Sequence, residues 1–277
     1  MDRIPKILHM YWDRGPMSQL QTFTVSTFHK HNPDWVINVY VPKQPYTGAS
    51  SFIPNYTGKD YFHLVEQSDY VNIVNVDLDD YNIDPGLHNI LRSDILRYHL
   101  LYEQGGVWSD FDVIWIKPID HFRNIEYYAE TPVEDVTAVV SLINGTNGGH
   151  SIGIMISCQH DEYAKELVEM TKRVTPPFGH ETFGSLMISR KYMTMESLSG
   201  FKGLICVKDE TYYPYRIHPP NPTFHKLYDA NDLSCINNNV LCVHWYNGKP
   251  NSKQYVNGNG FNKVCSMTTI LKNEGCI

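Results

Sequence analysis

Residues 87–116 carry the strongest fold signal in the chain and read LHNILRSDILRYHLLYEQGGVWSDFDVIWI. Apolar residues recur with the 3.6-residue period of a helix as far as Gln104, and Gly105-Gly106 ends that pattern. The next ten residues, Val107–Ile116, are apolar enough for a buried strand, which Lys117-Pro118 would close. The stretch therefore predicts a helix over Leu87–Gln104 and a strand directly after it.

Strand and helix patterns alternate along the rest of the chain. Residues 42–60 are rich in Pro, Gly, Ser and Asn, which predicts a long loop, and a Pro-rich turn at residues 175–177 begins a loop-rich tail. We expect a second helix over Asp161–Arg173 and strands over Ile4–Trp12, Val36–Val41, Val71–Val76, Thr137–Ile143, Ile152–Ser157 and Leu241–Trp245. The alternation predicts an α/β fold, and no repeat or boundary divides residues 1–277, so we expect a single domain.

Composition excludes several classes of protein. With 42% hydrophobic and 13% aromatic residues, the chain has ample material for a core, which excludes wholesale disorder. The net charge of −7, without a long basic run, argues against nucleic acid as the main partner. No long apolar run and no signal peptide are present, so we expect no transmembrane segment and a cytoplasmic protein, of a bacterial cell or a virus-infected host cell.

The sequence contains two Asp-x-Asp pairs, Asp77/Asp79 and Asp110/Asp112. About one such pair is expected by chance among 18 aspartates, so the motif alone is weak. Asp77 begins a segment that resembles a calcium loop but lacks its Gly and Glu, and we interpret it as a solvated loop. On a strand, Asp110 and Asp112 would point to one face, where a divalent cation such as Mg²⁺ or Mn²⁺ would relieve their repulsion.

The residues before the second pair strengthen it. Asp94 occupies a position on the apolar stripe of the predicted helix, and Arg97 lies one turn further on. They form either a half-buried ion pair or one wall of a polar cleft above the sheet. Trp108 would share the face of the two aspartates, either as a core residue or as an aromatic wall beside them.

The two segments Leu91–Tyr98 and Leu101–Asp112 resemble the signature of the DXD glycosyltransferases. This family includes relatives of the yeast-type initiating mannosyltransferases and of the glucosyltransferase domains of large clostridial toxins. Weaker similarity extends to residues 4–9 with Trp12, and to Val243-His244-Trp245. The resemblance implies a GT-A (Rossmann-like) nucleotide-sugar-binding fold, with a mixed central sheet flanked by helices. It also implies a nucleotide-sugar-binding half at about residues 1–120 and an acceptor-side half at about 121–277.

Carried over position by position, the resemblance implies a role for each matched residue. Asp112 would bind Mn²⁺ or Mg²⁺ directly, and Asp110 would hold the ribose and reach the metal. Asp94 and Arg97 would contact the donor sugar, with Arg97 also near the diphosphate. The remaining three side chains are aromatic: Trp12 would stack on the base, Trp108 would lie beside the donor sugar, and His244 would be a third metal ligand or a diphosphate contact.

The function implied is metal-dependent transfer of a hexose from a nucleotide sugar to a glycan or protein acceptor, with retention of configuration. Stacking at Trp12 favours a UDP-hexose as donor, with a GDP-hexose possible. The aromatic-rich segments Pro176–Met187 and Tyr212–Pro220 are candidates for an acceptor groove, or else surface turns. Two alternatives stay open: an Asp-x-Asp phosphohydrolase with Asp110 as nucleophile, and a non-catalytic carbohydrate-binding protein on the same scaffold.

Overall fold

The computed structural model describes residues 3–13, 15–48, 56–125, 135–142, 150–218 and 221–277. Its centre is a seven-stranded sheet in the order β3-β2-β1-β4-β7-β6-β8, in which β7 runs antiparallel to both of its neighbours and every other pairing is parallel. The strands are β1 Ile7–Tyr11, β2 Val36–Pro42, β3 Val71–Val76, β4 Gly106–Ser109, β6 Ala138–Leu142, β7 His150–Ser157 and β8 Leu204–Lys208. This confirms the predicted α/β class and its mixed central sheet.

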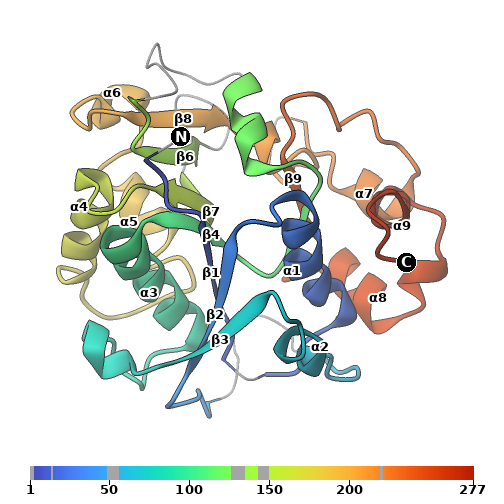
Figure 1. Ribbon diagram of the computed structural model, residues 1–277, viewed down its shortest axis with the longest axis horizontal. Helices are drawn as coiled ribbons and strands as arrows, with labels where there is room; N and C mark the ends of the chain where they lie inside the picture. The colour runs from blue at the N-terminus through green and yellow to red at the C-terminus, as the bar shows by residue number, and fades with distance from the viewer. Residues whose placement is uncertain (1–2, 14, 49–55, 126–134, 143–149, 219–220) are drawn as a thin grey trace.

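Helices cover both faces of this sheet (Figure 1). Helix α1 (Gln19–His31) packs on one face, whereas α3 (Asn89–Gln104) and α4 (Glu162–Thr171) pack on the other. Strand alternation separates the two layers, since Val107 of β4 joins the core under α1 and Trp108 joins the core under α3.

A second, two-stranded sheet lies beside the first, formed by β5 (Val113–Trp115) and β9 (Cys242–His244). The C-terminal helices α7 (His225–Asp229), α8 (Pro250–Asn257) and α9 (Ser266–Asn273) build a core with Ile114, Val243 and Trp245 around it. The short helices α2 (Phe62–Glu66), α5 (Ser185–Ser189) and α6 (Met195–Leu198) complete the fold.

The predicted strand over Val107–Ile116 is wrong, because it divides into β4 and β5 in two different sheets. The chain leaves the larger sheet after β4, and Asp110, Phe111 and Asp112 form a bend between the two. In that bend the carbonyl of Phe111 accepts a hydrogen bond from Thr24 Oγ1 of α1, at 2.8 Å. The motif therefore lies at a junction of sheets rather than within a strand.

Other elements went unpredicted or moved by a few residues. Helix α1 was missed, although Ser18 and Gln21 form a capping box at its start. The tail expected to be loop-rich contains β8, α5, α6, α7, α8 and α9. The end of helix α3 is as predicted, because Gly105 has a φ of 66° and a Cβ there would lie 2.5 Å from the backbone of Gln159. Part of the loop predicted over residues 42–60 lies outside the described residues.

None of the helices in the described part of the chain is long and apolar enough to cross a membrane.

Candidate active site

A cavity of about 850 Å³ opens at the carboxyl ends of the parallel strands β1 and β4 of the larger sheet. Trp12 follows the carboxyl end of β1 and Asp110 follows that of β4, and both residues line the cavity. Because β7 runs antiparallel to β4, residues 151–153 at its start lie at the same end of the sheet and line the cavity too. Open α/β sheets bind ligands at the carboxyl ends of their parallel strands, so the cavity occupies the expected place for a site.

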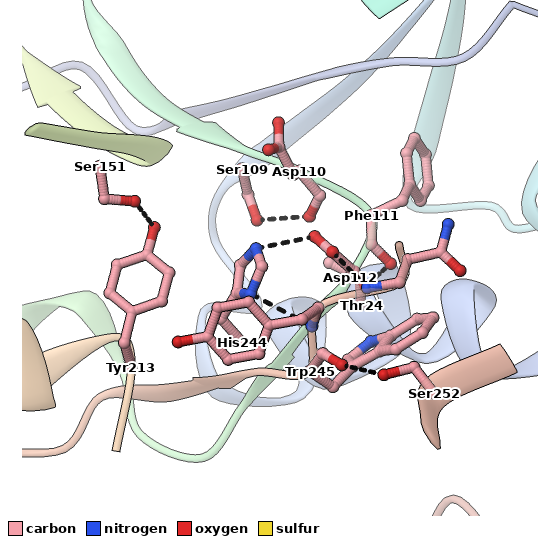
Figure 2. Close-up of polar contacts among 12 residues, drawn as sticks. Thr24, Ser109, Asp110, Phe111, Asp112, Ser151, Tyr213, His244, Trp245 and Ser252 are labelled. Atoms are coloured by element: carbon pink, nitrogen blue, oxygen red, sulfur yellow. Dashed lines mark hydrogen bonds and ion pairs between the residues drawn. The ribbon is translucent and has the colours of Figure 1, made fainter. Parts of the chain in front are cut away.

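Backbone contacts fix the Asp-Phe-Asp bend from both sides, and Figure 2 shows the bend with His244 and Trp245 beside it. The N–H of Asp110 donates to the carbonyl of Gly153 in β7, at 2.8 Å. The carbonyl of Asp112 accepts from the N–H of Trp245, just beyond β9, at 2.8 Å. One aspartate is thus tied to the larger sheet and the other to the smaller one, and the bend has little freedom to move.

The register of the small sheet brings His244 to this bend. Val113 pairs with His244 across the β5–β9 ladder, so the imidazole lies beside the preceding residue, Asp112. His244 Nε2 is 3.1 Å from Asp112 Oδ1, and the N–H of Asn247 donates to Asp112 Oδ2 at 2.8 Å. Burial raises the pKa of Asp112, but the attraction and hydrogen bonds of His244 and Asn247 outweigh it and lower the pKa overall.

Asp110, Asp112 and His244 form a group suited to a divalent cation. Each offers one ligand atom, and these atoms lie within 4.8 Å of one another. Carboxylate oxygens with an imidazole nitrogen are a donor set that suits Mn²⁺, and two carboxylates suit Mg²⁺. Gly153 leaves the adjoining space open, since a Cβ there would lie 3.3 Å from Asp110 Oδ2 and 3.4 Å from the His244 ring. The convergence of carboxylates is as predicted, although a bend produces it rather than strand alternation.

The proton of His244 bears on its predicted role as a metal ligand. The N–H of Tyr246 donates to His244 Nδ1 at 3.2 Å, which makes Nδ1 an acceptor and leaves Nε2 to donate to Asp112. In this arrangement the imidazole of His244 donates a hydrogen bond to the Asp112 carboxylate and holds it in place. Ligation through Nε2 would require the proton to move to Nδ1 and the Tyr246 N–H to turn away.

Arg97 of α3 forms ion pairs with two acidic residues of the site. Its Nη2 lies 3.2 Å from Asp94 Oδ1 and 3.0 Å from Asp110 Oδ1, and its Nη1 donates to the carbonyl of Ile152. The guanidinium also lies 4.7 Å from the centre of the Trp108 ring. The two readings left open for Asp94 and Arg97 are therefore both correct, because the ion pair is buried and also lines the cavity.

Burial shifts the acids on this side of the site in the opposite direction from Asp112. It raises the pKa of Asp94 to about 7, although the nearby Arg97 opposes the shift. It also raises the pKa of Asp110, where Arg97 again opposes and Asp112 adds to the increase. The cavity therefore holds carboxyl groups with different affinities for a proton.

The two tryptophans named from the sequence lie in different places. Trp12 lines the cavity, where its Nε1 donates to the carbonyl of Gly15 and its ring packs edge-on against Phe111. Trp108 is only 1% exposed and is absent from the cavity wall. Its Nε1 instead donates to Asp110 Oδ1 at 2.9 Å, so this indole acts on the site by holding a carboxylate.

Several residues of the cavity were not named from the sequence. Glu181 accepts hydrogen bonds from His180 Nδ1 at 3.0 Å and Ser185 Oγ at 2.6 Å, and the His180 bond is the main reason its pKa falls to about 2. Lys253 of α8 contacts Asn247 at 3.0 Å and adds a positive charge to the cavity. The two segments proposed for an acceptor groove both contribute to the wall, with residues 180, 181 and 185 from one and 213 and 216–218 from the other.

Residues 17–129 match the family described as a glycosyltransferase sugar-binding region containing a DXD motif. The match covers less than half of the chain. This region contains Asp94, Arg97 and the bend at residues 110–112, so the predicted family is confirmed for the part of the chain that forms one side of the cavity.

A curated relative and several solved structures are similar to the chain. The chain is similar to the initiation-specific alpha-1,6-mannosyltransferase of Saccharomyces cerevisiae, at 26% identity over 133 residues, which is 43% of this chain and 27% of that protein. The chain thus matches about a quarter of the relative's length. Among solved structures, PaToxG glycosyltransferase is 16% identical over 71% of this chain and 74% of its own, with a TM-score of 0.42. The galactosyltransferase LgtC, in complex with donor and acceptor sugar analogues, is 11% identical over 98% and 96%, with a TM-score of 0.45.

Proposed function

We propose that this protein is a metal-dependent glycosyltransferase that moves a hexose from a nucleotide sugar to a glycan or protein acceptor. The observation that carries the proposal is the convergence of Asp110, Asp112 and His244 in a cavity walled by the sugar-binding region. The cation would be Mn²⁺ or Mg²⁺, held by the two carboxylates, with His244 Nε2 as third ligand after its proton moves to Nδ1. When bound, it supplies Lewis-acid stabilisation of the diphosphate leaving group.

The electrostatics of the cavity support an anionic donor once a cation is present. Asp94, Asp110 and Asp112 would repel a diphosphate, and the positive charge of a cation offsets this repulsion. Lys253 adds a second cationic group on the same cavity. Burial lowers the pKa of Lys253, and the negative charge of Asp112 opposes that shift.

The geometry suggests how the donor would lie. Trp12 lines the cavity and would stack on the base, which favours a UDP-hexose over a GDP-hexose, and Asp110 would hold the ribose. Asp94 would accept hydrogen bonds from sugar hydroxyls. Arg97 would act at the donor sugar mainly by holding Asp94 and Asp110 in place, because its guanidinium already bonds both.

The rest of the wall is left for the acceptor. We place it in the half of the chain after residue 120, beside Glu181 and Arg216, whereas residues up to about 120 bind the nucleotide sugar. A cavity of about 850 Å³ lies at the upper end of the range for ligand sites, which suits a donor and an acceptor together. We further propose that the transfer retains the anomeric configuration.

The test is release of free nucleotide from a panel of UDP- and GDP-hexoses, with Mn²⁺, with Mg²⁺ and with chelator. We expect release from one donor, dependent on the cation and lost in Asp112→Asn. Release of phosphate from a generic phosphate ester, with no requirement for a nucleotide sugar, would contradict the proposal in favour of a phosphohydrolase. Binding of a nucleotide sugar without turnover in the presence of a glycan acceptor library would indicate a carbohydrate-binding protein.

A further inference from the structure

Tyr213 is an aromatic residue of the cavity wall with no role assigned so far. It lies two residues after the 3-10 turn Asp209–Thr211 and is 6% exposed. Its ring is tilted against that of His244, with 5.0 Å between the ring centres. Figure 2 shows the phenol extending past His244 to its contact with Ser151, on the side of the site away from Trp245.

Gly153 shows what the Tyr213 hydroxyl faces. A Cβ built on Gly153 would lie 3.0 Å from Tyr213 Oη, 3.3 Å from Asp110 Oδ2 and 3.4 Å from the His244 ring. The hydroxyl, one proposed metal ligand and the edge of another therefore surround one point, which only a glycine leaves open. A group bound to a cation at these ligands would lie next to the hydroxyl.

The hydrogen bonding of Tyr213 leaves its proton available. Ser151 Oγ donates to Tyr213 Oη, so the phenol oxygen acts as the acceptor in that pair. Within the described residues, no acceptor is found for the Tyr213 proton itself. A tyrosine phenol carries its proton at neutral pH. Tyr213 is thus a hydrogen-bond donor aimed into the site and oriented by Ser151.

We propose that the Tyr213 hydroxyl donates a hydrogen bond to the diphosphate oxygen that departs from the anomeric carbon, which makes Tyr213 a catalytic residue. This rests on the proposed function. The bond between the anomeric carbon and that oxygen breaks, and its electron pair stays on the oxygen. A new bond forms from the acceptor hydroxyl oxygen, whose proton goes to solvent. Tyr213 keeps its own proton and stabilises the growing negative charge.

The neighbouring tyrosine provides a matched control. Tyr212 is fully buried, is absent from the cavity wall, and its hydroxyl has no hydrogen-bond partner among the described residues. Tyr212→Phe and Tyr213→Phe therefore remove the same atom from adjacent buried rings, but only the second removes it from the site. Ser151→Ala removes the group that orients Tyr213 and leaves its hydroxyl in place.

The experiment measures kcat and KM for cation-dependent nucleotide release, the Kd for UDP with Mn²⁺, and Tm. We expect Tyr213→Phe to lower kcat by about 100-fold, as for the loss of one donor to a developing oxyanion. Its KM, Kd and Tm should stay near those of the parent. Ser151→Ala should lower kcat by a smaller factor, and Tyr212→Phe should leave it unchanged.

Two results would overturn the inference while leaving the proposed function intact: equal kcat for Tyr213→Phe and Tyr212→Phe, or a raised KM with unchanged kcat. The second would mean that the hydroxyl binds the donor equally before and during the reaction. A parent protein that releases no nucleotide from any donor, with or without an acceptor, would overturn the proposed function and this inference together.

Discussion

The two Asp-x-Asp motifs show how position in a sheet decides what the same residues can do. Asp77-Leu78-Asp79 follows β3 at the edge of the larger sheet, whereas Asp110-Phe111-Asp112 follows β4 near its middle. At the edge, Asp77 bonds the surface side chains Lys43 and Gln44 and caps the short turn after it, and Asp79 is exposed. This agrees with the expectation of a solvated segment.

Near the middle of the sheet, neighbouring elements surround the second motif. Strand β7 holds Asp110 from one side, and the end of β9 holds Asp112 and supplies His244 from the other. Helix α3 supplies Arg97, which forms an ion pair with Asp110. The motif therefore becomes a candidate metal site through its neighbours rather than through its own sequence.

The largest difference between the motifs should appear in catalysis. Asp112→Asn removes a charged cation ligand, and we expect it to lower kcat/KM for nucleotide release by about 1,000-fold. Asp79→Asn makes the same change in the edge motif and should leave kcat/KM within about 2-fold, as expected for an exposed residue outside the site. Steady-state assays with saturating Mn²⁺ compare the two. Equal activities for the two variants would remove the distinction between the motifs.

The cationic partners of the two motifs should differ in their effect on stability. Arg97→Gln removes the positive partner of the buried Asp94 and the partly exposed Asp110, and we expect it to lower the free energy of unfolding by about 3 kcal/mol. Lys43 pairs with Asp77 on the surface and is 56% exposed, so Lys43→Gln should cost less than about 1 kcal/mol. Urea unfolding of both variants provides the comparison. A loss below 1 kcal/mol for Arg97→Gln would mean that the two acids do not depend on it.

The open space beside the second motif can be filled directly. Gly153→Ala places a Cβ against Tyr213 Oη and Asp110 Oδ2, and we expect it to cost about 2 kcal/mol of stability and to weaken Mn²⁺ binding. Gly200→Ala is the control, because no atom lies within 4 Å of a Cβ at that position. Calorimetric titration with Mn²⁺ and urea unfolding measure the two effects. Unchanged Mn²⁺ affinity in Gly153→Ala would place the cation elsewhere.

The smallest and most specific difference should be in the pH dependence of stability. Burial raises the pKa of Asp94 to about 7, so its contribution to stability falls as the pH rises from about 4 to 7. The pKa of Asp77 is instead lowered by hydrogen bonds from Gln44, the Asp79 N–H and Lys43, so its contribution is present above about pH 4 and is lost as the pH falls.

Unfolding of Asp94→Asn and Asp77→Asn across pH 3–8, each compared with the parent, tests this difference in sign. As the pH rises, the parent's advantage over Asp94→Asn should shrink and its advantage over Asp77→Asn should grow. The same sign for both variants would contradict the opposite environments of the two acids.

Local patterns were sufficient to predict much of the fold. The period of apolar residues marked α3, and Gly105 marked its end, since few other residues could adopt that backbone conformation. Strand β3 was predicted with its observed bounds, because four of its six residues are the β-branched Val and Ile and an acidic stretch follows it. The division of Val107–Ile116 could not be predicted, because β5 pairs with a strand about 130 residues later, and nothing in the local sequence marks that partner.

The site shows the same limit. Asp94, Arg97, Asp110 and Asp112 lie within 19 residues of sequence, and their spacing together with the family signature identified them. The sequence did not decide whether Trp108 is buried, because strand alternation predicts the face to which a side chain points but not which residues cover that face. Glu181 and Tyr213 lie in the two segments named as candidates for an acceptor groove, but only the folded chain shows that they and Lys253 line the same cavity as the motif.

The most direct test of the candidate metal site is a crystal structure with Mn²⁺ and UDP, using the anomalous signal of manganese. The proposed function predicts one manganese peak within coordination distance of Asp110 and Asp112, with the UDP diphosphate on the open side and with His244 as third ligand once its proton has moved from Nε2 to Nδ1. A peak bound elsewhere, or UDP bound in this cavity with no manganese beside Asp110 and Asp112, would contradict it.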